Sequence, residues 1–173
     1  MNKYVSLLRG INVGGHKKVP MADLRKLLEK HGFKNVKTLL ASGNVVYESN
    51  PEKADKMSAF LEDHFGFPIP LLTFPFETIE KIVASDPFHK VELNEKTKLY
   101  VTFTREKPTP GFEVPFYADD GSFGVAGILD HAIFSFVDLE KTGTLDAMAF
   151  LEKDLGKDLT TRNYNTVVKI GKL

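Results

Sequence analysis

Hydrophobic and polar positions change their period along the first third of the chain. The segment 3–9, KYVSLLR, is short and apolar, as a central β-strand would be. Pro20 then stands where a helix would begin, and apolar residues recur at helical spacing as far as Gly32. A glycine followed by Phe33 is typical of a helix end. The pattern predicts a strand followed by an amphipathic helix.

Two more apolar runs lie within residues 35–49, on either side of Ser42, Gly43 and Asn44. Gly-Asn between two such runs is typical of a β-hairpin. The first expectation is therefore that these three residues form a turn. Asn44 offers a second role as a ligand contact, because asparagine tolerates positive φ and carries both a donor and an acceptor.

A helix is expected over 51–64, with Asn50 as the candidate cap, and the segment 67–74 then reads as a strand. The prolines of this strand favour a sheet edge. The order strand, helix, strand, strand, helix, strand is that of a ferredoxin-like domain. The fold class is thus α+β, with a ferredoxin-like βαββαβ subdomain at 1–75.

A second α+β subdomain is expected over 76–173. Its elements should be a short helix ending before Pro87, a strand at 98–104, two strands joined by a tight turn near Asp130, a helix over TLDAMAFLEKDLGK, and a final short helix capped by Thr160 or Thr161.

The predicted topology brings distant polar residues together. With right-handed crossovers, the end of the first strand lies near the turn between the second and third strands. A helix N-terminus directs free N–H groups to the same place, glycines allow close approach of backbone amides, and basic side chains add charge. This arrangement suits a phosphate or carboxylate. The candidate ligand-binding residues are Arg9, Gly10, Gly14, Gly15, His16, Lys17, Lys18, Ser42 and Asn44.

A purely structural interpretation stands beside this one. The glycines of the loop then serve a tight turn, and its lysines serve solubility. Near the C-terminus, Arg162 and Asn163 lie at the expected helix start, where asparagine caps are common. Alternatively, this end of the chain folds back on the N-terminal loop and contributes Arg162 to the same anion.

Composition limits the classes of protein to consider. Of the 173 residues, 42% are hydrophobic and 27% are charged, as in an ordinary globular protein. No apolar run approaches the roughly 20 residues of a membrane span, and the N-terminus does not resemble a signal peptide. A cytoplasmic location without membrane contact is therefore expected. The lack of cysteine excludes disulfides, thiolate nucleophiles and cysteine-bound zinc.

The charge distribution indicates where an acidic partner would bind. The formal net charge is zero, but residues 1–38 hold nine Lys or Arg and only two Asp or Glu, while 39–140 carry the compensating acid. Nucleic acid or another polyanion should therefore contact the N-terminal segment. The alternative is a solvated basic helix face.

Three familiar motifs are not supported. Gly10 and Gly15 frame a G-x-x-x-x-G pattern, but His16 stands where a phosphate-binding P-loop has lysine, and the parallel βαβ context is missing. The five histidines lack the spacing of metal ligands, so no metal site is expected. The candidate sheet strands also lack the aromatic set with which an RNA-recognition domain stacks bases.

Longer motifs carry a resemblance to a known family. LLRGINVGG, the downstream SGNVV and the late TTRNYNT resemble the bacterial family called domain of unknown function 1697, over nearly the whole chain. The resemblance implies two α+β subdomains, the first ferredoxin-like, and no established activity or cofactor. Tyr164 replaces the more usual tryptophan, and the segment 141–150 lacks the expected Gly-Arg-Ser-type turn. The recurring polar positions of the family fall on Arg9, Gly10, Asn12, Gly14, Gly15, Ser42, Gly43, Asn44, Arg162, Asn163, Asn165 and Thr166.

The sequence leaves three classes of function. The first is a binding protein for a phosphate-bearing ligand, either a nucleotide or nucleic acid, at the glycine-rich loop. The second is an enzyme acting on a small anionic substrate, with His16 as the proton carrier. The third is an interaction protein whose polar motifs maintain the junction of its two halves. The sequence identifies neither a cofactor nor an oligomeric state.

Overall fold

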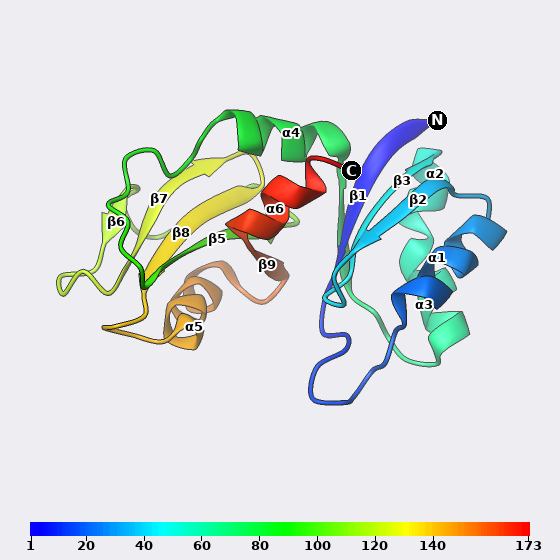
Figure 1. Cartoon of the computed structure of the whole chain (residues 1–173), viewed down its shortest axis with the longest axis horizontal. Coiled ribbons are helices and arrows are strands. Elements are labelled where there is room, and N and C mark those ends of the chain that lie inside the picture. The colour runs from blue at the N-terminus through cyan, green and yellow to red at the C-terminus, as the bar shows by residue number, and fades with distance from the viewer. The chain divides into compact units, whose positions relative to one another are not determined.

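The structure, a computed structural model, describes residues 1–173 and divides into two compact units. Unit 1 comprises Met1–Glu80 and Ile170–Leu173, and unit 2 comprises Lys81–Lys169 (Figure 1). Each unit contains one antiparallel sheet and helices. The expected mixed α+β class is therefore confirmed.

Unit 1 has a four-stranded sheet in the order β2-β3-β1-β4, in which all neighbouring strands are antiparallel. The fourth strand lies at the sheet edge as expected, but it begins at Leu71, after Pro68 and Pro70, the prolines on which that expectation rested. Three helices lie on one face of this sheet (Figure 1). The elements are β1 (Asn2–Leu8), α1 (Met21–Lys30), β2 (Lys34–Leu39), β3 (Asn44–Ser49), α2 (Pro51–Asp55), α3 (Met57–Phe65) and β4 (Leu71–Pro75).

The core of unit 1 explains why α1 forms. Leu24, Leu27 and Leu28 are buried at the i, i+3 and i+4 positions of a single helix face. They pack in one cluster with Leu61 of α3 and Val45 of β3. Burial of such a stripe against a sheet stabilises the helix more than its intrinsic propensity does.

The helix expected over 51–64 is divided. Lys56, at φ −87° and ψ −1°, separates α2 from α3, and Ala54 near the end of α2 and Met57 at the start of α3 are both buried. Asn50 occupies the cap position of α2, but its side chain makes no capping hydrogen bond. A continuous helix over this range was therefore the wrong prediction.

Unit 2 has a five-stranded antiparallel sheet in the order β6-β7-β8-β5-β9. Leu151 packs in a cluster with Val125 and Ile133, so α5 covers part of the sheet. The elements that follow β4 are α4 (Phe76–Ala84), which begins in unit 1, then β5 (Thr97–Thr104), β6 (Phe116–Tyr117), β7 (Phe123–Leu129), β8 (Ala132–Asp138), α5 (Thr144–Leu155), β9 (Leu159–Asn163) and α6 (Tyr164–Ile170).

The last segment corrects a prediction. Thr160 and Thr161, expected to cap a helix, lie in β9 and pair with β5. The β-branched residues suit a strand, and the Thr161 hydroxyl lies 2.8 Å from the hydroxyl of Thr102 on β5. The cap of α6 is Asn163 instead, whose Oδ1 accepts a hydrogen bond from the Asn165 amide at 3.0 Å.

Three hydroxyl groups, two of them buried, connect the strands of the unit 1 sheet. The Ser6 hydroxyl on β1 lies 2.8 Å from the Tyr47 hydroxyl on β3 and 2.7 Å from the Thr73 hydroxyl on β4. Ser6 and Tyr47 are fully buried. Burial raises the pKa of the Tyr47 phenol above its ordinary value of 10, although hydrogen bonds from Ser6 and Thr73 act in the opposite direction.

This raised pKa predicts a loss of stability in alkali. Because folded Tyr47 holds its proton more tightly than the unfolded chain does, the free energy of unfolding should fall as the pH rises above about 10. Tyr47→Phe should cost about 1 kcal/mol at pH 7.5, since Ser6 and Thr73 still pair with each other, and should flatten the decline. Urea unfolding at pH 7.5 and 10.5 measures the loss of stability at neutral pH and its further decline in alkali. Tyr117→Phe is the control, because Tyr117 is exposed. Parallel pH profiles for wild type and Tyr47→Phe would contradict this role.

Candidate functional site

The glycine-rich loop forms a small hairpin, which we call the arm (residues 12–18). Asn12 N–H donates to the Lys17 carbonyl at 3.1 Å, and His16 N–H donates to the Val13 carbonyl at 3.1 Å. Gly14 and Gly15, at φ 59° and 75°, supply the positive φ that the two central residues of a type I′ turn require. These two glycines are therefore explained by the turn.

The side chain of Asn12 fixes the base of the arm. Its Nδ2 donates to the carbonyls of Val19, at 3.0 Å, and Ala41, at 2.7 Å, and its Oδ1 accepts from the Val19 amide at 2.8 Å. Asn12 itself has φ 54°, a conformation that asparagine tolerates better than most residues. Both polar atoms of its side chain are thus engaged within the protein.

The turn between β2 and β3 lies against the base of the arm, as the topology predicted. Leu8 N–H donates to the Gly43 carbonyl at 2.8 Å. A Cβ at Gly43 would lie 2.7 Å from Leu8 Cβ and 2.8 Å from Ile11 Cδ1, so only glycine fits this approach. The Asn12 bond to Ala41 joins the same two segments.

Ser42 and Asn44 serve this turn locally. Asn44 is fully buried, and its Nδ2 donates to the Leu39 carbonyl at 2.7 Å and to the Ser42 hydroxyl at 3.2 Å. The positive φ values of the turn belong to Leu40 and Gly43, and Asn44 is the first residue of β3. The expected turn is confirmed, while a ligand contact for Asn44 stays a prediction.

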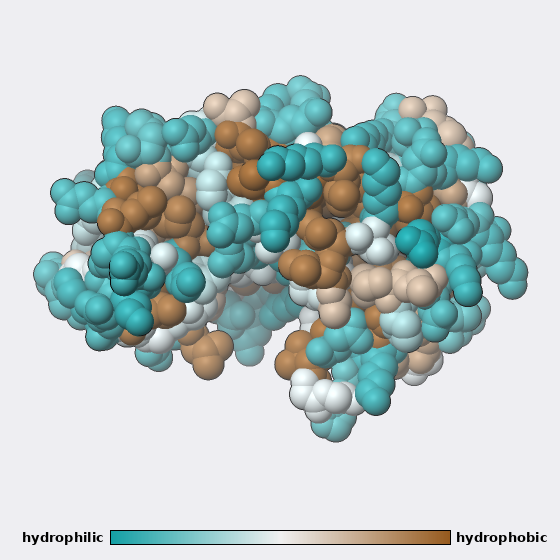
Figure 2. Space-filling model, viewed as in Figure 1, coloured by the Kyte–Doolittle hydropathy of each residue, from teal (hydrophilic) through white to brown (hydrophobic).

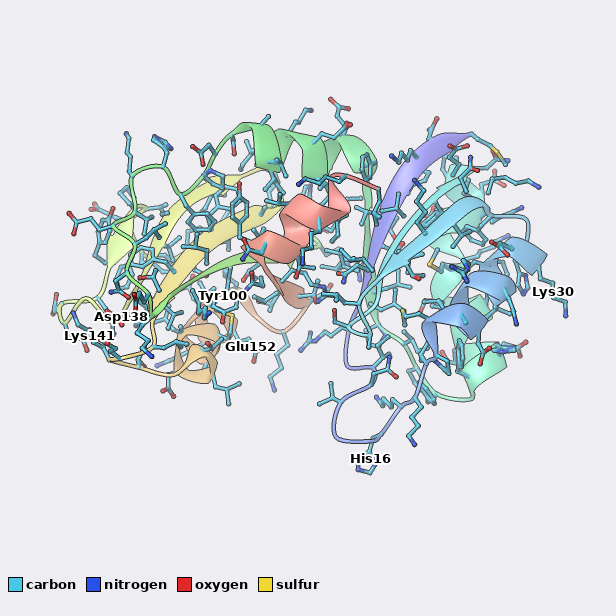
Figure 3. All side chains as sticks on the ribbon, viewed as in Figure 1. His16, Lys30, Tyr100, Asp138, Lys141 and Glu152 are labelled. Atoms are coloured by element: carbon cyan, nitrogen blue, oxygen red, sulfur yellow. The ribbon has the colours of Figure 1, made fainter.

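Basic side chains gather on the exposed part of the arm. His16, Lys17 and Lys18 are all exposed, and His16 lies at the tip of the loop (Figure 3). Figure 2 shows the loop as a projection in which hydrophilic side chains lie beside residues of intermediate and hydrophobic character. No hydrogen bond within the chain occupies the amides of Gly14 and Gly15. Arg9, at the root of the loop, is partly buried, and its amide donates to the Pro70 carbonyl at 2.8 Å.

A shallow depression of about 400 Å³ lies beside the arm. Val19, Pro20 and Met21 at the start of α1 form much of its lining, together with Ala41. No side chain caps α1, whose cap position is held by Pro20. The depression is therefore more apolar than a phosphate cradle, and the cationic groups stand around it on the projecting arm.

Arg162 and Asn163 belong to unit 2. Arg162 is only 8% exposed, and its Nη1 donates to the Thr160 hydroxyl at 2.8 Å and to the Thr161 carbonyl at 3.1 Å. Burial lowers the pKa of its guanidinium group to about 10. Asn163 caps α6. A contribution of Arg162 to an anion site with the N-terminal loop stays a prediction.

Sequence reasoning overlooked Val13. This residue is 69% exposed beside the two glycines of the arm, although it is a large hydrophobic residue. The only signal was its position inside a polar, glycine-rich loop. The structure contains no group of three or more His, Cys, Asp or Glu residues that could hold a metal ion. No helix has the length and apolar character needed to cross a membrane.

Fold and loop together define a two-unit α+β protein with an ordered, basic strand-to-helix arm. The model of the family described as Protein of unknown function (DUF1697) matches residues 1–116, and the chain belongs to this family. The conserved bacterial protein SP0830 from Streptococcus pneumoniae has a similar structure, with a TM-score of 0.73 at 24% sequence identity, covering 99% of this chain and 97% of that one. No curated protein matches the chain. The likeness to the streptococcal structure establishes the fold.

Asn12→Ala should loosen the arm. The substitution removes three hydrogen bonds and places alanine at positive φ, so the free energy of unfolding should fall by about 2 kcal/mol. Exchange of the Val19 amide with solvent should also accelerate, because its acceptor is lost. Urea unfolding and hydrogen exchange measure these effects. Asn12→Gly keeps the freedom of φ and separates the two causes, and Val13→Ala is the control. Unchanged exchange at Val19 in both Asn12 variants would rule out this role.

Proposed function

We propose that this protein binds a polyanion, namely the phosphate backbone of nucleic acid, through the arm. The observation that carries the proposal is the projection of three consecutive basic residues, His16 to Lys18, from a loop whose base is fixed by Asn12. Lysine side chains and free backbone amides are the groups with which proteins contact phosphate oxygens. Fixing the loop beforehand reduces the entropy lost on binding.

The shape of the site favours a polymer over a single nucleotide. Nucleotide pockets are concave and enclose most of the ligand. Here the basic groups lie on a projection, and the neighbouring depression is lined mainly by Val19, Pro20, Met21 and Ala41. A projecting arm suits an extended strand or duplex, which presents phosphates along its whole length.

The charge of unit 1 supports the same ligand. Unit 1 contains twelve Lys or Arg and nine Asp or Glu, whereas unit 2 contains eleven and fourteen. Arg25, Lys26 and Lys30 on α1 are exposed and extend the basic character beyond the arm. A locally basic surface attracts nucleic acid even on a protein of zero net charge, because screening limits the repulsion from distant acidic groups.

We also propose a ferredoxin-like arrangement for unit 1 and a cytoplasmic location for the protein. The strand order β2-β3-β1-β4 with antiparallel neighbours supports a ferredoxin-like arrangement for residues 1–75, and residues 76–173 then form the second subdomain. In such an arrangement the β1–α1 loop and the β2–β3 turn belong to one end of the sheet. A cytoplasmic location suits a cysteine-free chain that binds nucleic acid.

Val13 favours a second candidate, a contact with another protein. Its side chain is 69% exposed on the arm, and other residues of the arm, Gly15 and Lys18, line the mostly apolar depression together with Pro20 and Met21. Exposed apolar groups that gather in this way mark interaction surfaces. In that case binding would depend on Val13 and respond little to salt.

The two lysines of the arm provide the test for nucleic acid. Fluorescence anisotropy with a labelled duplex of random sequence, over a range of salt concentrations, gives the slope of log K against log salt. Lys17→Ala combined with Lys18→Ala should weaken binding and reduce this slope by about two, because two phosphate contacts are lost. Lys96→Ala with Lys98→Ala removes the same charge from exposed positions in unit 2 and should leave the slope unchanged.

Three results would refute the proposal: no binding of the duplex at low salt, binding that does not change with salt, or equal losses in the two double variants. If binding were instead lost in Val13→Ala and did not change with salt concentration, the second candidate would hold and the arm would be a surface for a protein partner.

A further inference from the structure

A cleft of about 550 Å³ opens in unit 2, between the segment 90–94 and the hairpin of β6 and β7. Clefts of this size bind small organic molecules when a few polar groups converge on an apolar lining. This cleft contains no residue of the arm and none of the residues that the sequence motifs indicated. Its lining therefore defines a separate candidate site.

The floor of the cleft is an aromatic surface built by strand register. Tyr117 on β6 lies opposite Gly124 on β7, which in turn lies opposite Phe136 on β8. The absence of a side chain at Gly124 leaves room for the Phe136 ring, because a Cβ there would lie 2.4 Å from Phe136 Cζ. The rings of Tyr117 and Phe136 are 5.9 Å apart at 50°.

Two apolar side chains of this cleft are left open to solvent. Tyr117 is 56% exposed on β6, and Leu93 is 62% exposed on the segment 90–94 that lines the same cleft. A single exposed hydrophobic residue is ordinary, but two that line one cleft beside a partly exposed Phe136 form a binding surface. A flat ring between Leu93 and Tyr117 would cover both, and aromatic side chains stack well on heterocyclic rings.

Polar groups with unused hydrogen-bonding capacity lie at the edge of this surface. Asp138 accepts from the Glu140 amide at 2.9 Å and from Asn94 Nδ2 at 3.3 Å, which occupies only part of the capacity of a carboxylate. Lys141 Nζ donates to the Asp120 carbonyl at 3.0 Å and has two further protons to donate. Asp138 and Lys141 lie near each other at this end of unit 2 (Figure 3).

We propose that this cleft binds an aminated heterocyclic base, such as an aminopurine. The ring lies between Leu93 and Tyr117 above Phe136, its exocyclic amino group donates to Asp138, and a ring nitrogen accepts from Lys141. The carboxylate selects bases with an amino group, because an unpaired acceptor at the edge of the cleft disfavours those without one.

Adenosine and purine riboside test this site, because they differ by one amino group and neither carries a phosphate that the arm would attract. Titrations followed by ¹H–¹⁵N NMR should give saturable shifts at Tyr117 and Asp138, with adenosine binding about tenfold more tightly. Tyr117→Ala should weaken adenosine binding by about tenfold or more, and Tyr117→Phe should preserve it. Asp138→Asn keeps an acceptor for the Glu140 amide and should remove the preference for adenosine.

Leu145→Ala is the matched control, because Leu145 is 84% exposed on α5 and does not line the cleft. The proposal is overturned if adenosine gives no saturable shifts, if the two nucleosides bind wild type equally, or if Tyr117→Ala binds as wild type does. Loss of duplex binding in the variants of the arm would leave these nucleoside titrations unchanged, so the two proposals fail independently.

Discussion

The three hydrogen bonds of the Asn12 side chain determine the shape of the candidate site. They connect the loop after β1 with Val19, two residues before α1, and with the β2–β3 turn at Ala41, twenty-nine residues away. Without them, a loop with two adjacent glycines at positive φ would sample many conformations. With them, the basic residues project from a fixed base, so the loop loses less conformational entropy when a ligand binds.

Much of the fold could be predicted from hydrophobic periodicity, because the buried residues of this chain recur at the spacing of the helix or strand that contains them. The buried leucines of α1 recur at helical spacing, and the Ser42-Gly43-Asn44 turn separates two strands. The prediction failed at β9, where Thr160 and Thr161 read equally well as helix caps or as strand residues. The segment became a strand because it pairs with the edge of β5. Its partner there, Thr102, is fifty-nine residues away from Thr161, so the local sequence could not indicate this pairing.

The candidate site was predictable in its location and unpredictable in its details. Chain topology brought the loop to the β2–β3 turn, but the sequence did not reveal that the side chains of Asn12 and Asn44 are engaged within the protein. The aromatic cleft of unit 2 could not be predicted from the sequence for a different reason. Tyr117, Gly124 and Phe136 meet only through the register of three strands, and register depends on tertiary pairing.

NMR chemical-shift mapping with a short nucleic-acid duplex at low salt tests the role of the arm most directly. The largest amide shifts are predicted at Gly14, Gly15, His16, Lys17 and Lys18, with smaller ones along the exposed face of α1, and all should fade as salt is added. Shifts confined to residues outside the arm, or a spectrum unchanged by the duplex, would contradict a polyanion-binding function for this loop.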